Sequence, residues 1–252
     1  MKKKIPLLLT IVAMFWAAFT LSGQNAVATY TFSGSAGDLS GNDAAVYGAQ
    51  LTADRFGNAN SAFLFDGNGT YLEAPNSEVL NTDYTTVAFW IKPTALPAQG
   101  EAYLISFGGW QERYKISLPS HGKCIWTTNG SSGISDMDAG DGNALTAGTW
   151  RHLAFVHDGS VDAIYIDGVK VAEKNVAGTL NATTRPLGIA YDAVDKANFF
   201  NGALDEVMIF DAALSAEDIA SLYAAQSTAP EVASGMVASY DFAKGSATDG
   251  SG

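Results

Sequence analysis

Tight-turn dipeptides are the feature that most constrains how this 252-residue chain can fold. Asp-Gly occurs five times and Asn-Gly three times, and both pairs accept the positive φ angles of the two-residue turns that join antiparallel strands. The segments between them are short, and apolar and polar residues alternate in them as in strands. The chain is therefore predicted to be all-β, with many short antiparallel strands.

The segments themselves suggest how the strands are layered. Segment 85–92 is apolar on both faces, which is typical of a strand in the middle of packed layers. Segment 150–176 predicts three strands joined by hairpin turns at Asp158-Gly159 and Asp167-Gly168. Further strands are expected at 26–32, 62–66, 70–74, 103–107, 114–118, 123–127 and 203–210. More than ten strands in one compact chain predict a two-sheet antiparallel sandwich.

One helix is clearly signalled, at residues 215–223. Ser215 is a suitable N-cap, and Asp218 stands three residues later, where its carboxylate completes a capping box. Leu214 and Ile219 have the spacing of a hydrophobic staple. We expect a short C-terminal helix at the rim of the sandwich.

The first residues have the features of an export signal. Three lysines at 2–4 precede a mostly apolar run at 5–21, and small or polar residues follow at 22–24. This order is typical of a secretory signal peptide, here residues 1–23; an uncleaved anchor is the alternative. Gln24 stands where a bacterial lipoprotein would carry its lipidated cysteine. The protein is thus expected to be secreted or at the cell surface, with no membrane insertion after cleavage.

The end of the chain repeats its beginning. Residues 237–242 (VASYDF) correspond to residues 27–32 (VATYTF). This repeat predicts one domain at 25–226, a linker at 227–234, and the truncated start of a second similar module at 235–252. Neighbouring modules of the same polypeptide are therefore expected partners.

Charge and cysteine content exclude some kinds of partner and of stabilisation. There are 14 Lys and Arg against 26 Asp and Glu, and the formal net charge of −12 becomes −15 once the three lysines of the leader are removed. Nucleic acid is therefore not an expected partner, because phosphate binding needs clustered cations. The single cysteine, Cys124, cannot form an intrachain disulfide and is expected to be buried in a strand.

Eight motifs in order carry a family resemblance. They are 27–32 (VATYTF), 38–42 (DLSGN), 51–58 (LTADRFGN), 62–67 (AFLFDG), 89–93 (FWIKP), 150–156 (WRHLAFV), 166–168 (IDG) and 202–207 (GALDEV), the last followed by Leu214-Ser215. Together they resemble the laminin-G-like jelly-roll family of the concanavalin A-like lectin and glucanase superfamily, over about residues 25–226. The resemblance implies a jelly roll of two curved antiparallel sheets, often a secreted glycan-binding or adhesive module attached to other domains.

No catalytic group is apparent in the sequence. Glucanases of this superfamily use Glu-x-Asp-x-x-Glu on one strand, and none of the glutamates here has an aspartate two positions on. His121, His152 and His157 lie near no recognised nucleophile. His152 is expected to be a hydrogen-bonded structural residue and His157 to be exposed. The chain is therefore not expected to be an enzyme.

Calcium is the one cofactor that the resemblance implies. Similar jelly rolls often hold a structural calcium ion between the first loop and the last strand, and the matching positions here are Asp38, Asn42 and Asp205. Hard cations favour such oxygen ligands. The alternative is that Asp38 and Asn42 only cap a turn and that Asp205 accepts backbone hydrogen bonds.

Glycan binding needs exposed aromatic faces beside a few polar groups. Trp90 and Trp150 lie in the family motifs and are expected in the core. The candidate ligand-binding residues lie outside those motifs and are Trp110, Arg113, Tyr114, Trp126, Tyr191 and Asp192. The alternative for each is a packed aromatic ring or a loop salt bridge. Because the chain is acidic, a neutral glycan or polysaccharide is the expected ligand.

Three functions therefore remain open after the sequence is read. The first is a secreted, non-catalytic carbohydrate-binding or adhesive module of a larger extracellular protein. The second is an accessory domain of a polysaccharide-degrading enzyme whose catalytic domain is not in this chain. The third is an architectural spacer in a repeat array.

Overall fold

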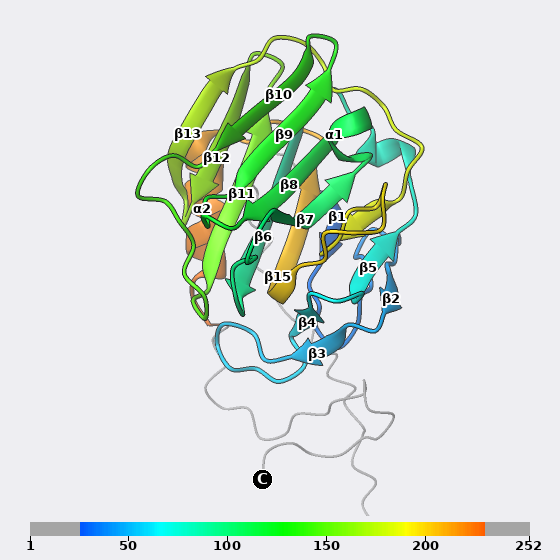
Figure 1. Ribbon diagram of the computed structural model, residues 1–252, viewed down its shortest axis with the longest axis vertical. Coiled ribbons are helices and arrows are strands. Elements are labelled where there is room, and N and C mark those ends of the chain that lie inside the picture. The colour runs from blue at the N-terminus through cyan, green and yellow to red at the C-terminus, as the bar shows by residue number, and fades with distance from the viewer. Residues whose placement is uncertain (1–25, 230–252) are drawn as a thin grey trace, which may run out of the picture.

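Two antiparallel sheets packed face to face form the domain in the computed structural model, which describes residues 26–229 (Figure 1). The predicted leader and the predicted start of a second module lie outside the described residues, as do residues 230–234 of the predicted linker. Within the described range, no helix is both long and apolar enough to cross a membrane. The predicted all-β, two-sheet antiparallel jelly roll with a short C-terminal helix is confirmed.

The eight-stranded sheet has the order β13-β12-β11-β6-β15-β4-β3, and β1 also pairs with β15. Its strands are β1 (Ala26–Tyr30), β3 (Gln50–Thr52), β4 (Ala62–Asp66), β6 (Thr85–Pro93), β11 (Arg151–His157), β12 (Val161–Ile166), β13 (Val169–Asn175) and β15 (Asn201–Phe210). The predicted three-strand meander is thus β11, β12 and β13, which pair antiparallel, with a register shift between Ile164 and Tyr165 in the second hairpin.

The seven-stranded sheet has the order β10-β9-β8-β7-β14-β5-β2. Its strands are β2 (Ala45–Tyr47), β5 (Tyr71–Ala74), β7 (Glu101–Phe107), β8 (Tyr114–Pro119), β9 (Ile125–Gly130), β10 (Gly133–Asp138) and β14 (Leu187–Ile189). A 3-10 turn, η1 (Glu78–Leu80), and a single-turn helix, α1 (Gly109–Glu112), lie in the connections.

The main core fills the space between the two sheets. The ring of Trp126 on β9 lies 5.8 Å from that of Phe155 on β11, which in turn lies 6.0 Å from that of Phe89 on β6. Cys124 is buried in this core, as predicted, and burial raises the pKa of its thiol to about 12. The domain is therefore held together by apolar burial and not by a disulfide.

The C-terminal helix α2 (Ala216–Gln226) covers the outer face of the eight-stranded sheet. The capping box is present, because Ser215 accepts from the Asp218 backbone N–H and the Asp218 carboxylate accepts from that of Ser215. Leu214 and Ile219 are buried together, as the staple predicted, in a second apolar cluster with Ala88, Ala154, Tyr165 and Met208. The helix is therefore a third layer over β6, β11, β12 and β15 and not only a rim element, which explains why segment 85–92 is apolar on both faces.

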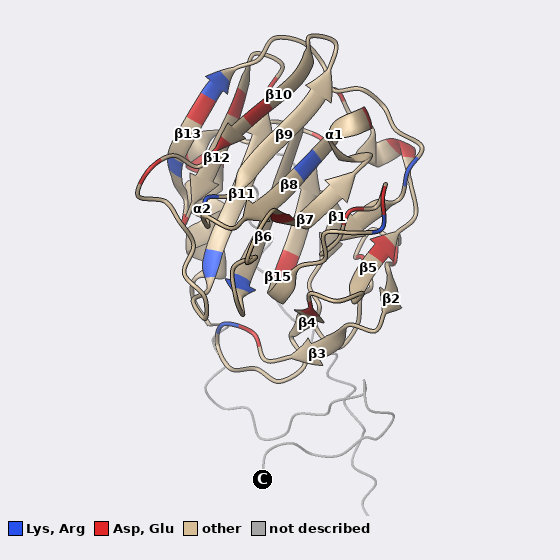
Figure 2. Cartoon of the chain, viewed as in Figure 1, with Lys and Arg blue, Asp and Glu red and all other residues tan. Residues whose placement is uncertain are grey.

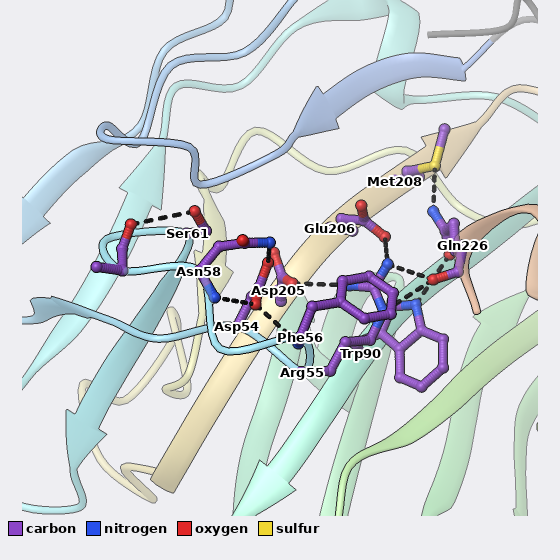
Figure 3. Close-up of polar contacts among 11 residues, drawn as sticks. Asp54, Arg55, Phe56, Asn58, Ser61, Trp90, Asp205, Glu206, Met208 and Gln226 are labelled. Atoms are coloured by element: carbon purple, nitrogen blue, oxygen red, sulfur yellow. Dashed lines mark hydrogen bonds and ion pairs between the residues drawn. The ribbon is translucent and has the colours of Figure 1, made fainter. Parts of the chain in front are cut away.

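Strand β15 contains a bulge that places two adjacent carboxylates on one side. The register to β6 shifts between Asp205 and Met208, and Glu206 has a φ of 47°. In a regular strand successive side chains point to opposite faces, whereas here Asp205 and Glu206 both reach Arg55 (Figure 3). Each carboxylate accepts a guanidinium hydrogen bond at 2.9 Å.

Arg55 also fixes the end of helix α2. Its guanidinium lies 4.4 Å from the Phe56 ring centre and 4.5 Å from that of Trp90, and it donates to the main-chain carbonyl of Gln226 (Figure 3). The Gln226 amide accepts from the Trp90 indole at 3.1 Å and donates to the Met208 sulfur at 3.4 Å. One cation thus satisfies an otherwise unpaired helix-end carbonyl and attaches the helix to the sheet.

Two carboxylates sharing one buried cation change the proton affinity of the cluster. Burial, and then the charge of Glu206, raise the pKa of Asp205 to about 8 despite Arg55, and burial raises the pKa of Glu206 as well. His152 lies nearby, with its ring 5.4 Å from that of Trp90, and burial lowers its pKa to about 3. The cluster therefore favours a protonated carboxyl group and a neutral imidazole.

Two expectations about histidines were wrong. His157 is buried, with Nδ1 2.8 Å from an Asp162 carboxylate oxygen and Nε2 2.9 Å from the Gly178 carbonyl. Successive strand residues point to opposite faces, so His157 faces the interior because its neighbour Val156 faces helix α2. There it lies opposite Asp162, its register partner on β12. His152 is structural as predicted, but within the described residues neither ring nitrogen has a hydrogen-bond partner; apolar and aromatic neighbours surround it.

The raised pKa of Asp205 predicts how stability depends on pH. Between pH 4 and 8 the folded state binds the Asp205 proton more tightly than the unfolded state does. The contribution of Asp205 to the free energy of unfolding therefore falls as pH rises, by at most about 1.4 kcal/mol per pH unit. His152 has the opposite effect, since its contribution is lost as pH falls from 6.5 toward 3. We expect the free energy of unfolding of wild type to fall relative to that of Asp205→Asn steadily from pH 5 to 8, and the relative value to level off above 8, because the neutral asparagine does not titrate.

The measurement is urea unfolding at pH 5 to 9 with a chelator present, so that bound cations do not contribute. Asp211→Asn is the matched control, because Asp211 is an exposed aspartate directly after β15. Its stability profile should run parallel to that of wild type. A parallel profile for Asp205→Asn would instead show that Asp205 does not hold a proton in the folded state.

The domain boundaries predict a resistant proteolytic core. Residues 26–226 form both sheets and the helix that covers one of them, so most of their backbone is hydrogen-bonded and protected from cleavage. Limited trypsin and chymotrypsin digestion, read by mass spectrometry, should leave a fragment close to 26–226. Early cleavage within strands β6 to β13 would contradict a single folding unit.

Candidate functional site

An aromatic stack lies on the outer face of the seven-stranded sheet, on the side of β2 and β5. Tyr47 and Tyr71 are register partners, and their ring centres lie 4.4 Å apart. The Tyr71 ring lies 4.0 Å from that of Tyr191 and 6.1 Å from that of Phe199. Tyr47 is 43% exposed and Phe199 is partly exposed, so the stack presents aromatic surface to solvent.

The loop of residues 190–200 supplies half of this stack by lying on the sheet. A Cβ atom at Gly188 of β14 would come within 2.8 Å of the Tyr191 ring, so only glycine allows Tyr191 to lie there. The Tyr191 hydroxyl donates to the Glu73 carboxylate, and burial followed by this contact raises the pKa of the phenol. Tyr191 is thus a fixed support, and Phe199 lies beside it with the two rings nearly parallel at 6.2 Å.

A hollow of about 410 Å³ opens beside Phe199. Three segments wall it, namely the end of β4 with its turn, the connection from β6 to β7, and the end of the 190–200 loop. The lining residues are Asp66, Gly67, Ala95, Leu96, Pro97, Ala98, Gln99, Glu101, Ala102, Asn198, Phe199, Phe200 and Asn201. Two aromatic side chains, of which Phe200 is buried, three amides and two carboxylates therefore line one concave site.

The middle of the same sheet face is closed by its own side chains. One register row runs across the face through Glu73, Gly188, Ser106, Lys115 and Thr127. Lys115 forms an ion pair with Glu101, and its Nζ lies 4.8 Å from the Tyr103 ring centre. Figure 2 shows a blue band on β8, the strand that carries Lys115. Because Ser106, Lys115 and Thr127 are buried, the accessible surface lies beside this row and not along it.

Most of the predicted ligand-binding residues are inaccessible in the structure. Trp126 and Tyr114 are fully buried between the sheets and cannot stack on a ligand. The alternation of the predicted strand 123–127 already indicated that Trp126 is buried, because it lies on the same face as Cys124, which was expected to be buried. Tyr191 and Asp192 are also buried, the first as a support for Phe199 and the second as an acceptor for the Val194 backbone N–H in the loop.

Arg113 supports the surrounding loops from inside. Its guanidinium is fully buried and donates to the carbonyls of Leu80, Thr82 and Asn181 at 2.6 to 3.1 Å. It was predicted as a polar ligand contact, but three of its five N–H donors are used by these carbonyls, and the whole side chain, including the unpartnered Nε, is buried. Arg113 is therefore a structural residue.

Trp110 is the one predicted aromatic that is exposed, at 44%. It lies on α1, next to a second hollow of about 470 Å³ that is lined by Gln111, Glu112, Asn181, Ala182, Thr183 and Thr184. Arg113, Tyr114 and Trp126 do lie together, but they are buried, so the structure does not bring the predicted residues to one accessible surface. Phe199 was not among the predicted residues, although the pair Phe199-Phe200 contained a signal, since adjacent residues in an extended chain point to opposite sides and only one can enter the core.

The three predicted calcium ligands each have other partners. Asp38 accepts from the backbone N–H groups of Thr29, Ser40 and Asn42, as expected for a turn cap. The Asn42 amide donates to the Pro75 carbonyl, and Asp205 pairs with Arg55. Over residues 26–229, no group of three or more His, Cys, Asp and Glu side chains is arranged to hold a metal ion. Calcium binding stays a prediction from the resemblance.

Comparison with solved structures shows the same fold in several binding domains. The binding domain of Paraclostridial Mosquitocidal Protein 1 has a TM-score of 0.65 and 22% identity, with 81% of this chain and 52% of that one covered. Domain 4 of AbnA, a GH43 extracellular arabinanase from Geobacillus stearothermophilus solved with arabinotriose, has a TM-score of 0.63 and 20% identity, with 79% and 98% covered. The binding domain of botulinum neurotoxin serotype G has a TM-score of 0.61 and 19% identity, with 81% and 52% covered.

These similarities differ in their extent. The chain spans about half the length of the Mosquitocidal Protein 1 and neurotoxin binding domains and nearly all of the arabinanase domain. No curated protein matches the sequence. Residues 66–220, more than half of the chain, match the laminin-G model described as the concanavalin A-like lectin/glucanases superfamily. The chain therefore belongs to the concanavalin A-like lectin/glucanases superfamily.

Proposed function

We propose that the domain is a non-catalytic carbohydrate-binding module and that the hollow beside Phe199 is its binding site. The observation that carries the proposal is the combination of a partly exposed aromatic ring, backed by a fixed aromatic stack, with amide and carboxylate groups around one concavity. Sugars bind in this way, with the apolar face of the ring on an aromatic side chain and hydroxyl groups paired to polar ones.

The hollow has the right chemistry and size for such a ligand. Its volume of about 410 Å³ lies within the usual range of small-molecule sites, about 300 to 1,000 Å³. Gln99, Asn198 and Asn201 each offer both a donor and an acceptor. Of the two carboxylates that line the hollow, Glu101 is already held by Lys115 and Ser117, so the two are not both available to act on a substrate. This supports binding without hydrolysis.

The setting of the module follows from the leader and the charge. A signal peptide at 1–23 would export the domain to the extracellular space or the cell surface, where polysaccharides are found. The acidic chain would repel anionic polymers, so neutral glycans are the proposed ligands. Further modules on the same polypeptide, begun by residues 235–252, would add avidity.

A second candidate function is an accessory domain of a polysaccharide-degrading enzyme. The similarity to nearly the whole of one domain of an extracellular arabinanase, solved with arabinotriose, favours it. The same site would then hold a catalytic domain elsewhere on the polypeptide close to its substrate. The two functions differ in which other domains share the polypeptide and not in the chemistry of the binding site.

Substitution of Phe199 tests the proposed site. Phe199→Ala removes the aromatic wall of the hollow, so retention on a gel-embedded neutral polysaccharide, or affinity for arabinotriose by calorimetry, should fall about tenfold. Trp110→Ala removes the exposed ring beside the other hollow and should leave binding unchanged. Thermal melting of both variants should match that of wild type, because both side chains are partly exposed.

Tyr84→Ala is the matched control, since Tyr84 is an exposed aromatic with the same 44% exposure as Trp110 and packs over Gly159, on a different turn. Loss of binding in Trp110→Ala alone would move the site to the Trp110 hollow. No binding by wild type across a broad panel of neutral glycans would favour the architectural spacer.

A further inference from the structure

The charge around the Phe199 hollow is one-sided. Among its lining residues the only charged side chains are Asp66 and Glu101, and neither Lys nor Arg lines it. Glu101 is compensated, because its two carboxylate oxygens contact the Lys115 ammonium and the Ser117 hydroxyl. The uncompensated charge at the hollow is therefore that of Asp66.

Asp66 is held in place while one of its oxygens stays available. It is the last residue of β4, and its Oδ1 accepts from the Asn68 backbone N–H and from the Thr70 hydroxyl, both at 2.7 Å. These hydrogen bonds lower the pKa of the carboxyl group, so it is ionised at neutral pH. Among the described residues, no hydrogen-bond partner is found for Oδ2, and the side chain is exposed.

The backbone places this carboxylate beside the amide wall. Asp66 and Asn201 are register partners of β4 and β15, and Asn201 is two residues from Phe199. A Cβ atom at the next residue, Gly67, would come within 2.8 Å of the Asn201 Cβ, so the turn and the loop are in close contact. A fixed carboxylate, an amide and an aromatic ring thus line the same hollow.

We propose that this hollow prefers a sugar bearing a protonated amine over the same sugar without a positive charge. The ammonium group of an amino sugar would donate to Asp66 Oδ2 while its ring packs against Phe199. A sugar carrying a carboxylate or a sulfate would meet the same charge as repulsion. This inference rests on the proposed function, keeps its exclusion of anionic glycans, and places amino sugars ahead of the neutral glycans named there.

The size of the preference follows from the exposure of the carboxylate. An ion pair at an exposed site contributes modestly and is screened by salt. We therefore expect the affinity ratio between the amine and its uncharged counterpart to be about fivefold at low ionic strength and to approach one in molar salt.

The test compares two oligosaccharides that share one backbone. The β-1,4-linked pentamers of glucosamine and of N-acetylglucosamine differ only in the charged amine and its acetyl group, and each is titrated into the folded protein at pH 6 in low salt by calorimetry. Wild type should bind the glucosamine pentamer about fivefold more tightly. Asp66→Asn keeps the acceptor oxygen of the turn and removes the charge, so it should lower the affinity for glucosamine to that for N-acetylglucosamine.

Asp211→Asn is the matched control, with the same change in net charge at the far end of β15 from Asn201. It should retain the preference, which separates a local contact from the general field of an acidic protein. Equal binding of the two pentamers by wild type, or a preference that survives in Asp66→Asn, would overturn the inference. Arabinotriose is titrated in parallel: binding of arabinotriose without the glucosamine pentamer would overturn the inference alone, and binding of no oligosaccharide would count against the proposed function itself.

Discussion

The pairing of strand β15 is the constraint on which the rest of the domain depends. Along one edge it pairs with β4 at its start and with β1 at its end, while β6 pairs with it on the other edge. The bulge at Asp205 and Glu206 falls where the neighbour changes from β4 to β1. Arg55 reaches the two carboxylates at that point, so a cation takes over where the hydrogen-bonded ladder is interrupted. One strand thus connects the first described strand, the central sheet and, through Arg55, the covering helix.

Much of the fold could be predicted because residues close together in the sequence determine it. The Asp-Gly turns set the β11 to β13 meander, and the capping box set the start of α2. Strands β2, β3 and β14 were missed, because three residues are too few to show an alternation. Strand β10 was missed because its apolar Ile134 is exposed and its polar Ser135 is buried, so the pattern does not show which face is inside. The bulge had no signal either, since an αL conformation at Glu206 is imposed by tertiary contacts and not by the preference of glutamate.

The candidate site was harder to predict because exposure is a property of the packed structure. Aromatic residues were correctly expected to matter, but residue type alone does not separate Trp126, which fills the core, from Trp110, which does not. The partners of Arg113 are three carbonyls from loops distant in sequence, and no local pattern brings them together. The hollow is likewise built from segments more than one hundred residues apart, at Asp66 and Asn201.

The attachment of Gln226 has a mechanical consequence. A helix that ends a domain is ordinarily the first element to peel away when the chain beyond it is pulled. Here Arg55 holds the carbonyl of the last helical residue and is itself held by two side chains of β15. Tension on the chain after Gln226 therefore passes through the guanidinium into the centre of the eight-stranded sheet, where it loads many backbone hydrogen bonds at once.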